Sequence, residues 1–368
     1  MITWHDELPF DFSDPITEQT FTERALFFDI ETTGFSPVRS GLYLIGCATR
    51  HGSRLLLDQF FAENRQDEPE LLRSFSALLA EYDTVISFNG TGFDIPYLKA
   101  KYRAHDISDP FCTCVLLDIY KEISRLKTLL ALPDLKQKSI ESFLGITRQD
   151  TYSGGELIEV YQAYRRAPST DALALLRQHN YDDVLCMPYL LPILAYHRLF
   201  GGDLSLLSVE ADESAALGGT IERALLFTLQ SVYPVPRPVS LRRGDCCLTA
   251  KADTVRLRIR LFDGELSYFF DNPKEYYYLP AEDRAIHKSL AAYVDHAHRR
   301  QATAATCYTK KHALFLPQHE ELFTPAFREK PKRGNADKSL CYFELTNDFI
   351  DSADMQLCYV RHLLAHMV

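Results

Sequence analysis

The strongest constraint on this chain is where four carboxylates stand relative to its apolar segments. Asp29 and Glu31 lie in FFDIETTG, Asp94 lies in FNGTGFDIPYL, and Asp183 lies in HNYDDVL. Side chains two apart on a strand point to the same face, so Asp29 and Glu31 can reach one ion. Hard cations such as Mg²⁺ take several oxygen ligands. Two such ions, about 3.5–4 Å apart, stabilise the attacking and leaving oxygens of a phosphodiester. The pattern therefore predicts a two-cation site and favours phosphodiester hydrolysis.

Length and composition indicate the broad class of protein. The chain has 368 residues, which favours two domains. Its 46% hydrophobic and 24% charged residues are typical of a soluble globular protein. We find no apolar run long enough for a membrane span and no secretory signal pattern. The nine cysteines lack zinc-ribbon spacing and are expected to be reduced. We therefore expect a cytoplasmic protein without a membrane partner.

Charge is distributed unevenly along the chain. The formal net charge is −10, and residues 1–200 hold 28 acidic against 19 basic side chains. The acidic excess thus lies in the half with the four carboxylates, where bound metal would offset part of it. A nucleic acid partner requires a basic patch, which we expect in the second half.

The first half shows the order of elements expected of a ribonuclease H-type α/β sheet. Residues 1–23 are expected to form an irregular lead-in to a domain over residues 24–203. Strands are predicted at Ala25–Ile30, Leu42–Thr49, Arg54–Phe60 and Thr84–Phe88. Helices are predicted at Glu70–Glu81, Asp94–Ala104, Val115–Lys127, Lys138–Leu144, Gly155–Arg166 and Thr170–Tyr196. A mixed sheet flanked by helices is the predicted fold.

The second half, residues 204–368, is predicted to be a smaller α+β domain of no recognised family. Asp263-Gly264 is expected to form a two-residue hairpin turn. Helices are predicted at Ile221–Gln230, Ala281–Arg300 and Met355–Met367, and a last strand at Phe343–Leu345. A further break is expected over 216–220, and a basic loop over 330–333.

Three arginines form a stripe on one face of the strand predicted at Thr254–Leu261. Arg256, Arg258 and Arg260 alternate with apolar side chains, and tyrosines and phenylalanines are dense nearby. Basic and aromatic side chains on a sheet can hold single-stranded nucleic acid. The alternative is a half-buried sheet whose arginines pair with neighbouring carboxylates.

Taken together, the three motifs resemble those of the DEDD superfamily, the DnaQ-like 3′–5′ exonucleases. The pattern is most similar to the bacterial YprB-type subgroup, and the resemblance covers roughly residues 24–197. It implies two Mg²⁺ or Mn²⁺ ions and a nucleic acid substrate. Asp29 matches the acid shared by both ions, and Glu31 and Asp183 match the other ligands of one ion. Asp94 matches the acid that holds the second ion.

The same resemblance implies further site residues. His179 lies four positions before Asp183, where it can share a helix face with it and act as general base. Asp182 is the alternative ligand in that turn. Thr32 and Thr33 match a loop that contacts the 3′-terminal nucleotide, and Asn89 and Phe93 would line the same cleft.

Several questions stay open at this level. The sugar of the substrate is undecided, because no motif reveals contacts to a 2′-hydroxyl. The role of the second domain, the pathway and the oligomeric state are open as well. An inactive nucleic acid-binding scaffold and a structure-selective endonuclease on the same fold are the alternatives to an exonuclease.

Overall fold

The computed structural model describes residues 1–148, 152, 154–215, 221–329 and 340–368. The expected break over 216–220 and the basic run over 330–333 lie outside these residues. The chain forms two compact units, Met1–Arg198 with Val235–Arg237 and Leu199–Pro234 with Pro238–Val368. The short segment returns to the first unit because Tyr196 Oη donates to the carbonyl of Arg237 (2.6 Å) and accepts from its N–H (3.1 Å).

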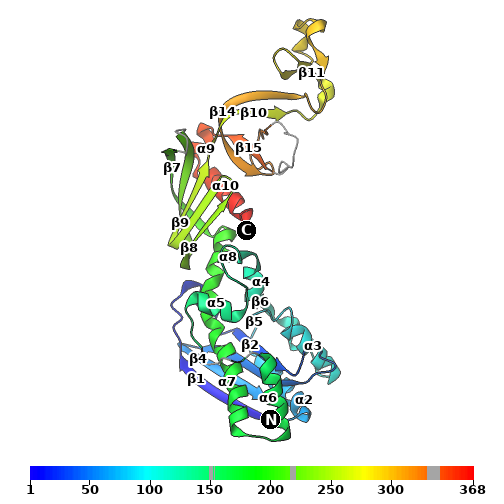
Figure 1. Cartoon of the computed structure of the whole chain (residues 1–368), viewed down its shortest axis with the longest axis vertical. Coiled ribbons are helices and arrows are strands. Elements are labelled where there is room, and N and C mark those ends of the chain that lie inside the picture. Colours follow the sequence, from blue (N-terminus) through cyan, green and yellow to red (C-terminus); the bar gives the residue numbers. More distant parts are fainter. Residues whose placement is uncertain (149–151, 153, 216–220, 330–339) are drawn as a thin grey trace. The chain divides into compact units, whose positions relative to one another are not determined.

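The first unit contains a six-stranded mixed sheet in the order β1-β4-β3-β2-β5-β6 (Figure 1). Its strands are β1 (Ile2–Pro9), β2 (Ala25–Thr32), β3 (Leu42–His51), β4 (Arg54–Phe61), β5 (Thr84–Ser87) and β6 (Val115–Asp118). The pairs β1–β4, β4–β3 and β3–β2 are antiparallel, whereas β2–β5 and β5–β6 are parallel. The four strands predicted between residues 25 and 88 are confirmed, and β2 lies in the middle of the sheet.

Two predictions for the first unit are wrong. Residues 1–23 are not an irregular lead-in, because β1 pairs along its whole length with β4 and its burial alternates strictly. Three of its polar residues, Thr3, His5 and Glu7, are exposed, which hid the strand in an acidic segment. The helix predicted at Val115–Lys127 begins instead as strand β6, because residues 115–118 pair with β5 and only Asp118 starts a helix.

Helices cover both faces of this sheet. They are α1 (Pro15–Thr20), η1 (Arg65–Asp67), α2 (Glu68–Leu79), α3 (Asp94–Ala104), η2 (Pro110–Thr113), α4 (Ile119–Ile123), η3 (Ser124–Leu126), α5 (Gln137–Leu144), α6 (Gly154–Arg166), α7 (Thr170–Cys186), η4 (Pro188–Ile193) and α8 (Leu194–Gly201). One buried cluster joins α2 and α3 to Leu26, Phe28 and Ile30 of β2. A second joins α6 and α7 to β3 and β4. Because side chains alternate on β2, the odd-numbered Asp29 and Glu31 face the α7 side.

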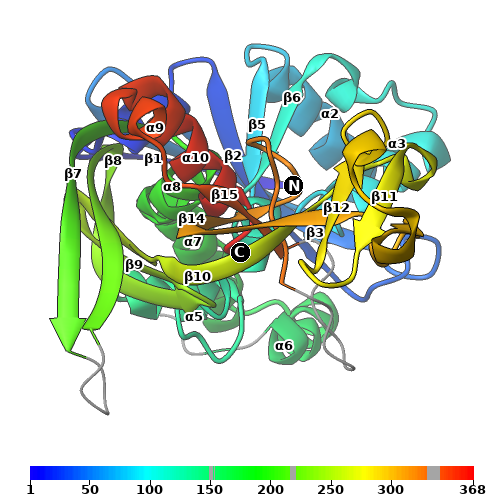
Figure 2. The same cartoon turned by 90° about the horizontal axis from the view of Figure 1, so that it is seen from above.

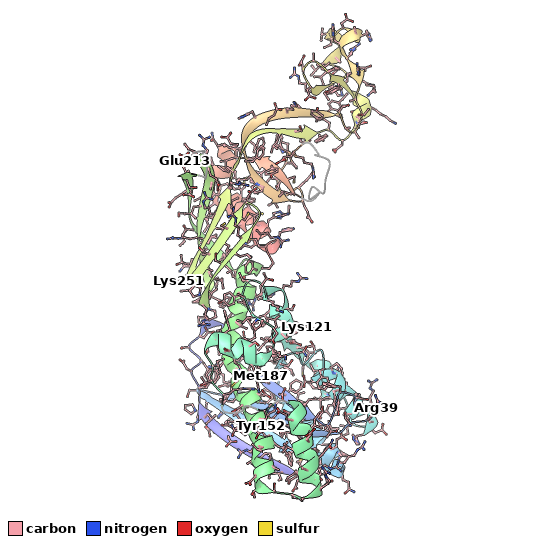
Figure 3. All side chains as sticks on the ribbon, viewed as in Figure 1. Arg39, Lys121, Tyr152, Met187, Glu213 and Lys251 are labelled. Carbon is pink, nitrogen blue, oxygen red and sulfur yellow. The ribbon has the colours of Figure 1, made fainter. Side chains whose placement is uncertain are left out.

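The helical run Thr170–Gly201 is long and apolar enough, by length and composition, to cross a membrane, contrary to the expectation from sequence. Within the protein, however, 67% of its most apolar window is buried. Met187, which ends α7 and is labelled in Figure 3, is itself buried. This burial is that of a core helix, whose apolar side chains pack against its own protein.

The second unit is rich in strands. They are β7 (Leu204–Ala215), β8 (Ile221–Arg243), β9 (Cys246–Arg260), β10 (Phe262–Phe269), β11 (Tyr276–Leu279), β12 (Arg284–His287), β13 (Arg300–Gln301), β14 (Tyr308–His319) and β15 (Leu340–Glu344). The helices are η5 (Pro273–Glu275), η6 (Ala291–Tyr293), η7 (His296–His298), α9 (Asn347–Asp351) and α10 (Ala353–Ala365). The strands form three sheets, β7-β8-β9, β10-β14-β15 and β12-β11-β13. Figure 2 shows β10 and β14 side by side, as their antiparallel register requires.

Three predictions for the second unit are wrong, whereas the last strand and terminal helix are confirmed as β15 and α10. The segment Ile221–Gln230 is part of strand β8 and pairs with β7. Asp263-Gly264 lies inside β10, opposite Leu314 and Ala313, and does not form a turn. The helix predicted at Ala281–Arg300 contains strand β12, and Asp283 before it has φ +50°, which a helix cannot include. Segments β8 and β12 pair with the strands that precede them, β7 and β11, whereas β10 pairs with the distant β14. In each case strand pairing overrode the local pattern.

Candidate active site

The strand β2 presents two acids to helix α7. Glu31 is buried, and Asp29 is half-buried and lies opposite Gly46 of β3. A Cβ on Gly46 would lie 2.1 Å from Asn180 Oδ1 and 2.7 Å from Val184 Cγ2 of α7. The glycine therefore allows α7 to approach the sheet closely at the position of the two acids.

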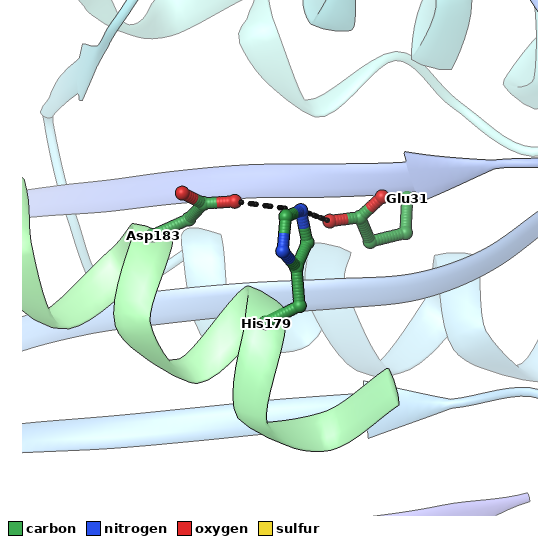
Figure 4. A group of neighbouring side chains, drawn as sticks. All are labelled: Glu31, His179 and Asp183. Atoms are coloured by element: carbon green, nitrogen blue, oxygen red, sulfur yellow. Dashed lines mark ion pairs between the residues drawn. The ribbon is translucent and has the colours of Figure 1, made fainter. Parts of the chain in front are cut away.

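Helix α7 contributes His179 and Asp183 to the same place (Figure 4). His179 Nε2 lies 3.2 Å from Asp183 Oδ2 and 3.5 Å from Glu31 Oε1. The two α7 residues are one turn apart, so both side chains point to the sheet. His179 is 5% exposed, which places its ring within the cluster and away from bulk water.

The fourth acid, Asp94, is the first residue of α3 and is 8% exposed. Burial raises the pKa of Asp94 to about 7, against backbone N–H groups of Asp94 and Ile30 that lower it, and the charge of Asp118 raises it further. Asp118, which lies in no recognisable sequence motif, accepts hydrogen bonds from the N–H groups of Asn89 (2.8 Å) and Thr91 (3.0 Å). It thus anchors the loop that leads into α3.

Electrostatics indicate that the four acids face one another. Burial raises the pKa of Asp29 well above its usual value, and the charges of Asp183, Asp94 and Glu31 raise it further, in that order. The amide of Asn180 opposes this shift, donating to Asp29 Oδ2 at 3.2 Å. Like charges that repel one another in this way can be stabilised together by a cation.

Arg148 and the buried Glu141 extend the cluster on the α5 side. Arg148 Nη2 lies 2.5 Å from Asp183 Oδ1, and Arg148 Nε lies 3.1 Å from Glu141 Oε2. Gln137 Nε2 donates to Glu141 Oε1 and to the carbonyl of Asp183, both at 2.9 Å. The sequence signal for Arg148 was weak, since it lies in a polar loop without a recognisable motif.

The donor set fits a divalent cation. Ligand atoms of Glu31, His179 and Asp183 all lie within 4.8 Å of one another, and Asp29 adds another carboxylate facing them. Carboxylates suit Mg²⁺ and Mn²⁺, and imidazole is compatible with Mn²⁺ and other transition metals. Asp182 has a different partner, since it accepts from Gln178 (2.8 Å) and lines a cavity of about 740 Å³ with Trp4 and Tyr181.

The residues expected to contact the substrate fall into two groups. Thr32 ends strand β2 directly after Glu31, and Thr33, Asn89 and Phe93 lie in the loops that adjoin β2 and α3. Thr33 Oγ1 accepts from the N–H of Gly41 (2.8 Å), so it braces the loop after β2. Phe93 is half-buried, and the neighbouring Phe35, whose ring is 5.9 Å away, is 89% exposed. Phe35 was missed from the sequence, although it directly follows TTG.

The arginine stripe lies on β9 of the second unit, where the apolar alternation is as predicted. Arg258 pairs with Asp212 (2.5 Å) and Glu222 (2.9 Å). Arg260 is bound by Asp245. Arg256 is exposed and lines a groove of about 750 Å³ along β8 and β9. Two of the three arginines thus have carboxylate partners, as the alternative interpretation expected.

Comparison with known proteins agrees with the fold. Residues 26–195 match the family model of the RNase_H superfamily, so this part of the chain is a ribonuclease H-like domain. A DNA polymerase of Methanocaldococcus jannaschii is 26% identical over 106 residues, which is 27% of this chain and 6% of the polymerase. The chain therefore spans a small part of this curated relative.

Solved structures give weaker similarities. The family B DNA polymerase of Pyrobaculum calidifontis has a TM-score of 0.39 and 15% identity, over 71% of this chain and 39% of the polymerase. Escherichia coli exonuclease I in complex with a dT13 oligonucleotide has a TM-score of 0.30 and 13% identity, over 56% of this chain and 55% of the exonuclease. The chain covers less than two thirds of either protein.

Proposed function

We propose that this protein is a metal-dependent 3′–5′ exonuclease of the DEDD type, similar to the YprB subgroup, that hydrolyses single-stranded DNA or RNA. The observation that carries the proposal is the convergence of Asp29, Glu31, Asp94 and Asp183 from three elements of the first unit. The charges of Asp183, Asp94 and Glu31 all disfavour the ionised form of Asp29, and the fold nevertheless brings these acids together. Such an arrangement is expected where a cation is bound in function.

The position of each acid suggests which metal ion it would hold. Asp29, which interacts with the other three, would contact both of two Mg²⁺ or Mn²⁺ ions. Glu31 and Asp183, which flank His179, would hold one ion, and Asp94 would hold the other. When bound, the ions would supply a water of lowered pKa and stabilise the charge on the leaving oxygen.

His179 would accept the proton of the attacking water. The carboxylates of Asp183 and Glu31, 3.2 and 3.5 Å from Nε2, would stabilise the imidazolium that forms. The water oxygen forms a bond to phosphorus while the bond to the 3′ oxygen of the preceding nucleotide breaks. The products are a 5′-monophosphate and a chain with a new 3′ hydroxyl.

The test is degradation of 5′-labelled single-stranded DNA and RNA oligonucleotides in Mn²⁺, with wild type beside Asp29→Asn and Asp182→Asn. Asp182 is the matched control, because it is adjacent to Asp183 in sequence and is bound by Gln178. We expect a ladder from wild type and from Asp182→Asn, none from Asp29→Asn, and none after EDTA. The preferred oligonucleotide identifies the sugar.

Two outcomes would replace the proposal. Cleavage of a circular single strand that depends on Asp29 would indicate an endonuclease. Binding of the oligonucleotides with no cleavage sensitive to Asp29→Asn would indicate a nucleic acid-binding scaffold.

A further inference from the structure

Asn180, the residue after His179, links a candidate metal ligand to the sheet. Its side chain is fully buried. Asn180 Nδ2 donates to Asp29 Oδ2 at 3.2 Å, and Asn180 Oδ1 accepts from Gln59 Nε2 at 3.0 Å. Gln59 is on β4, is 1% exposed, and donates a second hydrogen bond to the carbonyl of Arg177 at 3.1 Å. A chain of two buried amides thus ends on Asp29.

The direction of both amides follows from hydrogen-bond chemistry. A backbone carbonyl only accepts, so the Gln59 atom that faces Arg177 must be the amide nitrogen. Arg177 Nε, 3.4 Å from Gln59 Oε1, requires the same orientation. The Gln59 nitrogen then needs an acceptor on Asn180, which turns the Asn180 nitrogen toward Asp29.

These hydrogen bonds restrict the carboxylate of Asp29. One oxygen, Oδ2, is held by an amide donor, so rotation of the carboxylate is restricted. Helix α7 cannot move away from the sheet without breaking the hydrogen bond between Asn180 and Gln59. It cannot move closer either, because Asn180 already fills the space beside Gly46. A hydrogen bond behind a ligand commonly fixes its orientation and raises metal affinity.

We propose that Asn180, oriented by Gln59, is a positioning residue that holds the Asp29 carboxylate for divalent cation binding. The proposal rests on the proposed function, since it requires that Asp29 bind a metal. Its role differs from that of the four acids, because the amide would contact the carboxylate and not the ion.

The test is Mn²⁺ binding to the full chain, followed by the loss of the EPR signal of free Mn²⁺, with thermal unfolding as the control for folding. Asn180→Leu keeps the shape of the side chain and removes its hydrogen bonds. Gln178→Leu is the matched control, since that amide is on the same helix but donates to Asp182. We expect Asn180→Leu to raise the half-saturating Mn²⁺ concentration roughly tenfold or more, with Gln178→Leu unchanged.

Asp29→Asn separates this proposal from the proposed function. If Asp29→Asn binds Mn²⁺ as wild type does, the metal site itself is refuted, and the role of Asn180 with it. If Asp29→Asn loses Mn²⁺ while Asn180→Leu binds normally, only the positioning role is overturned. Should Asn180→Leu fail to fold, Gln59→Leu decides, since it frees the Asn180 amide to rotate. A weaker Mn²⁺ affinity in Gln59→Leu would support the proposal, and an unchanged one would reject it.

Discussion

Arg148 places Nη2 2.5 Å from Asp183 Oδ1, so a guanidinium already neutralises part of the acid cluster. Its Nε faces the buried Glu141, and the charges of both carboxylates raise the pKa of Arg148. The Arg148 guanidinium therefore pairs with two carboxylates that differ in their exposure to solvent. The other oxygen of the Asp183 carboxylate, Oδ2, lies next to His179 and faces the acid cluster.

Replacing Arg148 by leucine should destabilise the protein. Glu141 is 2% exposed and would lose its cation, which costs about 3 kcal/mol when a buried ion pair is broken. Urea unfolding of Arg148→Leu measures the loss. The double variant Arg148→Leu/Glu141→Leu should regain much of it, since no buried charge is then unpaired. A double variant less stable than Arg148→Leu would contradict this account.

Gly46→Ala should impair both stability and catalysis. Its Cβ would lie 2.1 Å from Asn180 Oδ1, so α7 must shift away from the sheet at β3, at a cost of about 2 kcal/mol for such overpacking. The shift separates Asp183 from Glu31 and should lower exonuclease activity more than tenfold. Gly201→Ala is the control, because a Cβ at this position would point into open space. Equal activity and melting temperature in both variants would disprove the tight approach of α7.

The raised pKa of Asp94 predicts a pH dependence of stability in the metal-free protein. The carboxyl holds its proton up to a pKa of about 7 in the fold but only to about 3.8 when unfolded. Between these values the folded state binds more protons, so stability falls as pH rises. In EDTA, the melting temperature of wild type should fall relative to that of Asp94→Asn between pH 5 and 7.5. A constant difference between the two proteins would reject the shift.

Asp118→Ala should lower activity although Asp118 is not among the four acids. Asp118 accepts from the N–H groups of Asn89, Thr91 and Tyr120, and its loss frees a loop in which Asn89 has φ +63°. We expect a stability loss of about 3 kcal/mol, as for several hydrogen bonds to one buried charge. Activity at saturating Mn²⁺ should fall because Asp94 is displaced.

A control for Asp118 is Asp109→Ala, which removes a similar cap from η2. It should cost only about 1 kcal/mol. Its activity should equal that of wild type, and a loss equal to that of Asp118→Ala would show that the effect is not specific to the loop before α3.

Strand pairing explains where prediction from sequence failed. Residues 221–230 and 281–300 contain helix formers, yet each joins a strand whose partner is supplied by another segment. Strand β1 was likewise not predicted, because an edge strand with one polar face contains few apolar residues. The arginine stripe shows the same limit, since Asp212 and Glu222 reach Arg258 only after β7 and β8 have paired.

The sequence by itself determined four of the six strands of the central sheet, the common face of Asp29 and Glu31, and the one-turn spacing of His179 and Asp183. These features follow from local periodicity, which depends on neighbours a few residues apart. Only the tertiary structure decided which groups support the acids. Asn180, held by Gln59, donates to Asp29, and Arg148 pairs with Asp183. Asp118 anchors the loop before Asp94. Such contacts join residues from different elements, and their distances depend on how closely the packed elements approach.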